Sequence, residues 1–228
     1  MRDIDDTTIA QSLPHKTVVP LNAGDPAIPA AWAPIAATTE ANGRAATALS
    51  LWPAARFEVV PRFREVLATR LLDVRIVSAD SQPALVYIVD DPRENRVVTW
   101  IGYDPAAFSE PPRFWDSFPE PLQLFLRELH AGFVSRDSYS FGVSKPAFME
   151  TIAEIAQSPD GIDFWDEIQP YHSTRLLQIC ANGPGTQYCV CPDLAVGQVA
   201  IVDEVEIEVE DFAKAFDGLL LARFREND

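Results

Sequence analysis

Acidic and branched apolar residues alternate along residues 203–211, and this pattern constrains the fold more than any other feature of the chain. A period of two is typical of a β-strand with one buried face and one solvated face. Val205, Ile207 and Val209 are therefore expected to face a core. The carboxylates expected on the opposite face are those of Glu204, Glu206, Glu208 and Glu210.

This row of like charges has two interpretations. Carboxylates on one face of a strand repel one another, so the row carries an energetic cost that needs a reason. Charged side chains on an edge strand keep it from pairing with other strands. Alternatively, the carboxylates meet a basic surface on another molecule. The pattern alone leaves both interpretations open.

The charge balance of the whole chain limits the kinds of molecule that it is expected to bind. Its 228 residues contain 18 Lys and Arg against 34 Asp and Glu, a net charge of −16. Residues 1–110 hold 14 acids and 10 bases, whereas residues 111–228 hold 20 acids and 8 bases. Direct nucleic-acid binding is disfavoured because phosphate contacts need clustered Lys and Arg, and an anionic membrane surface is disfavoured for the same reason. A basic protein is the favoured partner.

The cysteines, the length of the apolar runs and the composition of the N-terminus together indicate a cytoplasmic protein. No apolar run approaches the roughly 18 residues of a membrane-spanning helix, and the acidic N-terminus lacks the apolar stretch of a secretory signal. Cys180, Cys189 and Cys191 are odd in number, which predicts reduced, buried thiols. A structural zinc site needs four ligands at paired spacing, so we predict no metal and no cofactor.

Apolar spacing predicts an α+β fold in which an antiparallel sheet packs with helices. Residues 1–55 are rich in Pro and Ala and are expected to form an irregular arm with a short helix near 45–51. Helices are predicted at 61–72, after Ser117, at 146–157 and at 211–224. Strands are predicted at 74–78, 84–89, 97–103, 176–180, 186–191, 199–202 and 203–211.

Two local signals concern the central helix. Ser117 and Glu120 have the spacing of a capping box, which predicts that the helix begins there. Gly132 is expected to end the helix. His130, in the predicted last turn, would interact favourably with the negative end of the helix dipole.

An aromatic pair among acids is the second candidate for partner binding. Phe164 and Trp165 are bracketed by the acids Asp160, Asp163, Asp166 and Glu167. Either Trp165 packs inward, or the pair anchors a basic protein while the acids steer it. The candidate partner-binding residues are thus Asp163, Trp165, Asp166, Glu167 and the four carboxylates of the acidic strand. None of the common hydrolase, nucleotide-binding or metalloprotease motifs is present, so we predict no catalytic residues and no enzyme activity.

The second half of the chain resembles the SMI1/KNR4 (SUKH) superfamily over about residues 113–228. Residues 118–133 resemble that family's Pro-led opening helix, and residues 179–190, with Asn182 and Gly183 at their turn, resemble its strand–turn–strand segment. Phe212, Phe216 and Leu219 match the spacing of its last helix. Residues 1–110 then form an N-terminal extension or subdomain, and residues 111–228 the SMI1/KNR4-like domain.

The resemblance implies a function in binding. Bacterial members of the superfamily are immunity proteins that neutralise toxins, often nucleases or other nucleotide-attacking enzymes, and they carry no catalytic residues to transfer to this chain. We therefore expect an antitoxin whose partner is a basic cognate toxin. A regulatory scaffold, the role of fungal members, is the alternative, and an uncharacterised enzyme is the third hypothesis.

Overall fold

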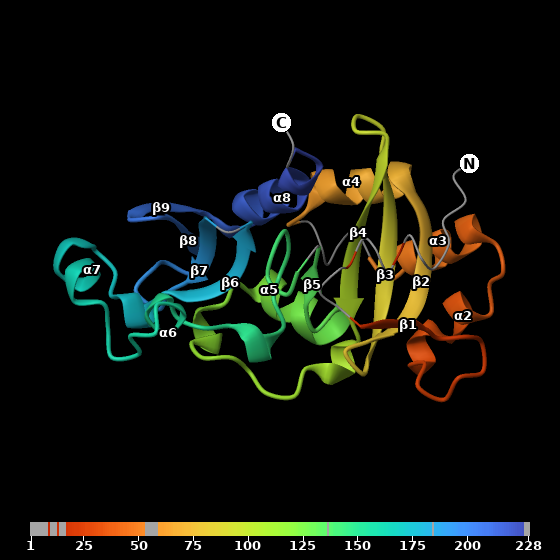
Figure 1. Cartoon of the computed structure of the whole chain (residues 1–228), viewed down its shortest axis with the longest axis horizontal. Coiled ribbons are helices and arrows are strands. Elements are labelled where there is room, and N and C mark those ends of the chain that lie inside the picture. Colours follow the sequence, from red (N-terminus) through yellow and green to blue (C-terminus); the bar gives the residue numbers. More distant parts are fainter. Residues whose placement is uncertain are drawn as a thin grey trace.

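Two antiparallel sheets with short helices packed around them make up the fold, as predicted for the α+β class. The computed structural model describes residues 9 and 13 and residues 17–52, 59–135, 137–183 and 185–225. Figure 1 shows the two sheets side by side along the long axis of the molecule. The acidic segment 203–211 belongs to the sheet at the left-hand end of this view.

The first sheet has five strands in the order β1-β2-β3-β4-β5. Their bounds are Val18–Pro20 (β1), Leu71–Ala79 (β2), Gln82–Asp91 (β3), Arg96–Tyr103 (β4) and Phe133–Val134 (β5). The three strands predicted between residues 74 and 103 are confirmed, each somewhat longer than expected. Asp80 and Ser81 form the tight turn between β2 and β3 with φ of 51° and 67°, as hairpins of two-residue loops require.

The second sheet has four strands in the order β6-β7-β8-β9. Their bounds are Leu177–Asn182 (β6), Thr186–Val190 (β7), Gln198–Asp203 (β8) and Glu206–Asp211 (β9). The predicted continuous strand over 203–211 is wrong at its start. Asp203 pairs with Glu206, and Glu204 and Val205 form the turn between them, Glu204 with a φ of 53°. A two-residue turn leaves the acid–apolar spacing unbroken, so the alternation concealed it.

The helices are short, and most flank the sheets. Their bounds are Ala33–Ala36 (α2), Ala41–Leu49 (α3), Pro61–Arg70 (α4), Glu120–Leu124 (α5), Ile152–Ile155 (α6), Asp163–Ile168 (α7) and Phe212–Ala222 (α8). Single 3-10 turns lie at Ala30–Trp32, Pro105–Ala107, Trp115–Ser117, Pro146–Phe148, Ser173–Arg175 and Arg223–Arg225. The predicted irregular arm therefore contains β1, α2 and α3 in its described part. Residues 1–8, 10–12, 14–16 and 53–58 lie outside the described residues.

The predicted capping box at Ser117 is wrong. Pro119 disfavours helical backbone at Phe118, which has a ψ of 133°, so α5 begins only at Glu120 and no side chain caps it. The helix continues as a π-helical turn over Phe125–Leu129. A capping box does occur at Thr151, whose backbone N–H donates to Glu154 Oε2 at 2.8 Å while its hydroxyl accepts from the Glu154 N–H at 3.2 Å.

One apolar core runs beneath both sheets. It contains Trp52, Phe63, Trp100 and Phe133 around the first sheet, and it continues to Ile179, Val199, Phe212, Phe216 and Leu220 at the second. Asp217 of α8 reinforces this connection by accepting a 2.9 Å hydrogen bond from the backbone N–H of Phe63 in α4. The domain boundary between residues 110 and 111 stays a prediction, and β5, which lies beyond it, pairs with β4.

Candidate functional site

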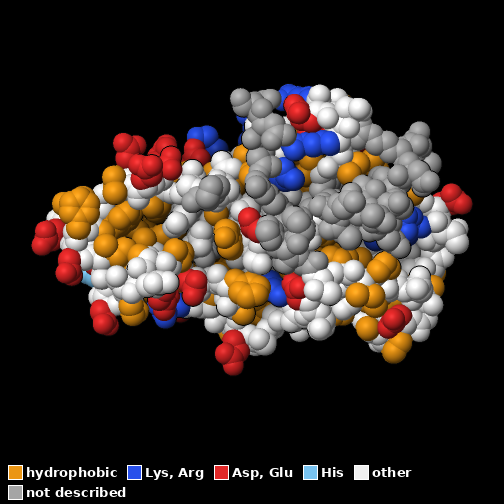
Figure 2. Space-filling view, in the orientation of Figure 1, with side chains coloured by type: hydrophobic (Ala, Val, Ile, Leu, Met, Phe, Trp, Pro, Cys, Tyr) orange, Lys and Arg blue, Asp and Glu red, His pale blue; other side chains and the backbone are white. Residues whose placement is uncertain are grey.

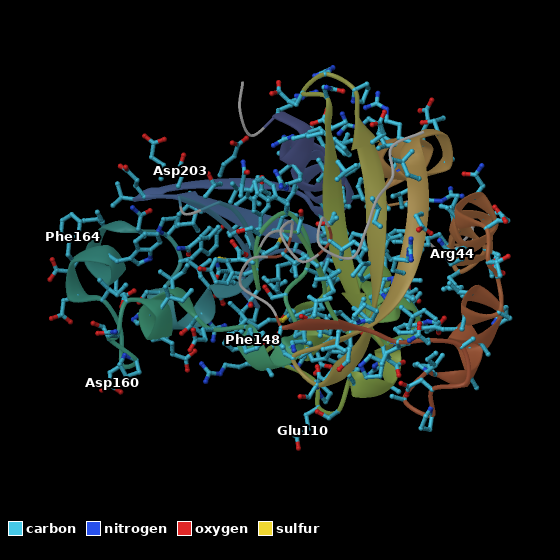
Figure 3. The ribbon with its side chains drawn as sticks, turned by 45° about the vertical axis from the view of Figure 1, so that its right-hand side comes forward. Arg44, Glu110, Phe148, Asp160, Phe164 and Asp203 are labelled. Atoms are coloured by element: carbon cyan, nitrogen blue, oxygen red, sulfur yellow. The ribbon has the colours of Figure 1, made fainter. Side chains whose placement is uncertain are left out.

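Acidic residues concentrate at one end of the molecule. Residues 146–213 contain thirteen Asp and Glu and a single Lys or Arg, namely Arg175. The guanidinium of Arg175 is itself paired with Asp193, through Nε–Oδ2 and Nη2–Oδ1 distances of 2.5 and 2.6 Å. We call the outer surface of α7, the β8–β9 turn and β9 the acidic end. Figure 2 shows acidic side chains interleaved with hydrophobic ones there, and Figure 3 places Phe164 and Asp203 at the same end.

The two segments singled out in the sequence meet at this end. The side-chain amide of Gln169, directly after α7, donates a 2.7 Å hydrogen bond to the carbonyl oxygen of Val205 in the β8–β9 turn. Ile207 of β9 packs against the apolar cluster that contains Trp165 of α7. Segments about forty residues apart in the chain, 163–168 and 204–209, therefore form one continuous surface.

The exposed apolar side chains of the acidic end are not those predicted. Trp165 is only 5% exposed and donates from Nε1 to the carbonyl oxygen of Tyr171 at 3.0 Å, so it packs inward. Its neighbour Phe164 is 65% exposed, and Ile168, one helical turn further along the same face, is 55% exposed. Val205 in the turn is also exposed. The aromatic side chain available to a partner is thus Phe164.

The predicted acids of α7 differ in what they do. Asp163 and Glu167 are exposed. The carboxylate of Asp166 instead fixes the segments on both sides of α7, because it accepts hydrogen bonds from the backbone N–H of Ile162 before the helix at 3.1 Å and of Ser173 after it at 2.6 Å. Asp166 therefore positions α7 and is not free to meet a partner.

The carboxylates of β9 likewise include one that is paired within the chain and two that are exposed. Glu206, Glu208 and Glu210 alternate along the strand and share its α8-facing side. Glu210 forms an ion pair with Lys214 in the first turn of α8. Glu206 and Glu208 are exposed, as is Glu204 in the turn. Burial raises the pKa of Tyr188 on β7 to about 12, with smaller contributions from Cys180 and from the charges of Glu210 and Glu208.

The three cysteines are buried and unbridged, as predicted. Burial in apolar surroundings raises the pKa of all three thiols above the ordinary value, which disfavours the thiolate needed for reaction or metal binding. Cys189 and Cys191 pack with Trp165 and Ala200 in a second apolar cluster, separate from the main core. Among the described residues, no three His, Cys, Asp or Glu side chains come together as metal ligands.

His130 has a different environment from the one predicted. It is fully buried, and its Nε2 lies 2.9 Å from the Tyr87 hydroxyl while Nδ1 lies 3.2 Å from the carbonyl oxygen of Tyr103. A carbonyl oxygen can only accept, so the ring proton resides on Nδ1 and Nε2 accepts from Tyr87. Burial lowers the pKa of His130 to about 3, and the predicted interaction of a charged ring with the helix end is therefore wrong.

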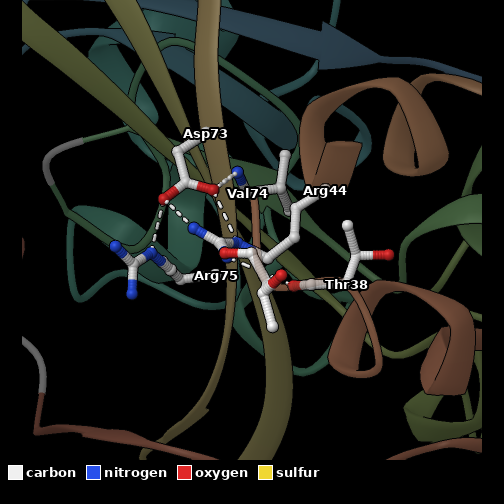
Figure 4. Close-up of polar contacts among 6 residues, drawn as sticks. Thr38, Arg44, Asp73, Val74 and Arg75 are labelled. Atoms are coloured by element: carbon white, nitrogen blue, oxygen red, sulfur yellow. Dashed lines mark hydrogen bonds and ion pairs between the residues drawn. The ribbon is translucent and has the colours of Figure 1, made fainter. Parts of the chain in front are cut away.

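A basic cluster lies at the end of the molecule opposite Phe164 (Figure 3). Arg44 of α3 binds the buried carboxylate of Asp73 in β2 through Nε and Nη2, at 2.8 and 2.7 Å, and Arg75 binds the same carboxylate through Nε (Figure 4). Arg44 Nη1 also donates to the carbonyl oxygen of Thr38 at 3.2 Å. These contacts hold α3 against β2, beside a hollow of about 170 Å³.

The chain matches no known protein family, and no curated protein or solved structure is significantly similar to it. Within the described residues, no helix combines the length and the apolar character needed to cross a lipid bilayer. The structure therefore defines the class as an α+β protein with two antiparallel sheets, and a fold of this kind does not by itself specify a function.

Proposed function

We propose that this chain is a non-catalytic binding protein that captures a basic protein at its acidic end, and that its biological role is to neutralise a cognate toxin. The observation that carries the proposal is the Gln169–Val205 contact, which unites α7 and the β8–β9 hairpin in one surface. Through it, the exposed apolar side chains of Phe164 and Ile168 lie at the same end of the molecule as the exposed carboxylates of Asp163, Glu167 and Glu204. The exposed Glu206 and Glu208 lie at this end too, on the face of β9 opposite to Ile207.

The composition of this surface suits a protein partner. Exposed aromatic and aliphatic side chains surrounded by charged ones resemble the apolar centre and polar rim of protein interfaces. Carboxylates that are exposed to solvent accelerate the encounter with a basic protein, while apolar contacts slow its dissociation. Arg175, the single base of residues 146–213, is paired with Asp193, and Lys214, which follows, is paired with Glu210, so neither offsets the exposed acids.

The antitoxin role rests on the resemblance of residues 113–228 to the SMI1/KNR4 superfamily and on charge complementarity. Enzymes that attack nucleic acids carry basic surfaces for the phosphates, and an acidic surface is complementary to them. A regulatory scaffold of the same superfamily type is the second candidate, since the same surface serves a basic partner that is not a toxin. The identity of the neighbouring gene distinguishes the two.

The test is to co-express the chain with the toxin encoded beside its gene and to measure survival. The proposal predicts survival with the unaltered chain and loss of protection with the double variant F164A/I168A. Val19 lies in β1 of the other sheet and is 54% exposed, so V19A is the matched control and should still protect. A neighbouring gene that encodes no toxin, or survival that does not depend on this chain, would overturn the antitoxin role.

A further inference from the structure

The two edges of the second sheet differ, because one is covered by other segments and the other is open. The outer edge of β6 is covered: Ala181 N–H donates to the Tyr139 carbonyl oxygen, and Ser144 N–H donates to the Ile179 carbonyl oxygen, both at 2.8 Å. Gln178 N–H adds a bond of 2.9 Å to the carbonyl oxygen of Glu150. On the other edge, β9 is hydrogen-bonded to β8 alone within the described residues. Figure 1 shows β9 along the outer margin of the sheet.

The direction of each backbone group on β9 follows from one hydrogen bond. Phe212 N–H donates to the Gly197 carbonyl oxygen at 2.8 Å, in register with the pairing of Glu210 and Val199. Hydrogen-bonded and non-hydrogen-bonded pairs alternate along an antiparallel ladder. The backbone N–H and C=O groups of Glu206, Glu208 and Glu210 are therefore the ones that bond to β8. The N–H and C=O groups of Ile207 and Val209 consequently point toward the open edge.

We propose that β9 binds its partner by strand addition, and that the added strand alternates basic and apolar side chains. This inference rests on the proposed function and specifies the kind of segment that the basic partner presents. The outward N–H and C=O groups of Ile207 and Val209 would bond to the backbone of the added strand, as in other complexes formed at a sheet edge.

Side-chain alternation determines which sequence fits. Residues directly opposite each other in neighbouring strands point to the same face of the sheet. The added strand therefore places basic side chains beside Glu206 and Glu208, and apolar side chains beside Ile207 and Val209. On that second face, Val209 is 36% exposed and Ile207 is partly buried against the Trp165 cluster.

The same carboxylates also exclude the wrong strands. A second copy of this chain would bring its own Glu206 and Glu208 against the row, and like charges directly opposite are destabilising. Edge protection and docking, the two interpretations of the acidic alternation, are thus compatible. The row repels acidic and self-pairing strands and admits a basic one.

The probe for this proposal is a peptide as long as β9, blocked at both ends, in which Lys and Val alternate. Its affinity is measured for the full chain and for the variants V209P and V209A. Proline removes an outward N–H without removing a bond to β8, whereas alanine keeps the N–H and shortens the side chain. Strand addition predicts that V209P weakens binding by about tenfold or more and that V209A weakens it by less.

A second measurement does not depend on how the proline variant folds. The alternating peptide is N-methylated at every second residue, on the register that would bond to β9, and should then lose binding by a similar factor. A peptide of the same composition with Lys and Val in separate blocks is the control for charge alone. Amide hydrogen exchange of Ile207 and Val209 should slow only with the unmethylated alternating peptide.

Strand addition would be overturned if three peptides bound equally: the alternating one, its N-methylated form and the one with Lys and Val in separate blocks. Amide exchange at Ile207 and Val209 would then also be unchanged. That outcome would leave the proposed function standing, because the acidic end would still bind basic chains through its side chains. Failure of the proposed function appears separately, as absence of toxin neutralisation in the co-expression experiment.

Discussion

Gln169 reaches across from the end of α7 to the carbonyl oxygen of Val205, 36 residues further along the chain, in a hydrogen bond of 2.7 Å. This contact holds the helix that carries Phe164 and Ile168 beside the hairpin that carries Glu204, Glu206 and Glu208. Together with the packing of Ile207 on the Trp165 cluster, it keeps the two segments of the acidic end side by side, so that one partner can contact both.

Removing the Gln169 amide should weaken partner binding while the fold persists. The variant Q169A loses one exposed hydrogen bond, a loss of about 1 kcal/mol, so we expect roughly fivefold weaker binding to the toxin and a similarly small change in unfolding free energy. Isothermal titration with the toxin measures the first and urea denaturation the second. Unchanged affinity would show that α7 and the hairpin do not act together.

The exposed carboxylates should act mainly on the rate of association. The triple variant E204Q/E206Q/E208Q is expected to slow association with the toxin several-fold and to flatten its dependence on salt, because steering by exposed charges is screened by ions. The control is E65Q/E94Q/E110Q, which removes three exposed acids outside the acidic end. Stopped-flow kinetics at several salt concentrations compares the two. Equal slowing by both variants would assign steering to net charge alone.

His130 should make the fold sensitive to mild acid. Its pKa falls from 6.5 to about 3 on folding, so the unfolded chain takes up the proton first. The associated stability is fully present above pH 6.5 and is lost as the pH falls from 6.5 toward 3, by about 2 kcal/mol between pH 7 and pH 5. Chemical denaturation over this range measures the loss. In nuclear magnetic resonance the His130 ring should remain neutral to pH 5, and a titration midpoint near 6.5 would contradict the account.

The cysteines should be unreactive in the folded protein. Cys180, Cys189 and Cys191 are buried with raised pKa values, so alkylation at pH 8 should run about a hundredfold slower in the native protein than in denaturant. Mass spectrometry after timed exposure to iodoacetamide gives the rate at each thiol. A cysteine that reacts as fast in the folded as in the unfolded chain would instead be a reactive site.

Local periodicity was enough to predict the α+β class and most strands, because those segments pair with near neighbours along the chain. Periodicity failed to predict features that depend on contacts between distant segments, such as which side chains are buried. The sequence gives no sign of which of Phe164 and Trp165 turns inward, and the spacing from Phe164 to Ile168 becomes informative only once α7 is known to be a helix. The turn at Glu204 is hidden within an unbroken alternation, and the burial of His130 depends on Tyr87 in a distant strand.

Amide hydrogen exchange of the chain, alone and bound to the toxin encoded beside its gene, tests the central claim most directly. The account predicts that binding slows exchange in residues 162–169 and 203–211, at the acidic end, and leaves α3 and β2 around Arg44 unchanged. Slower exchange around Arg44, with residues 162–169 and 203–211 unaffected, would contradict it.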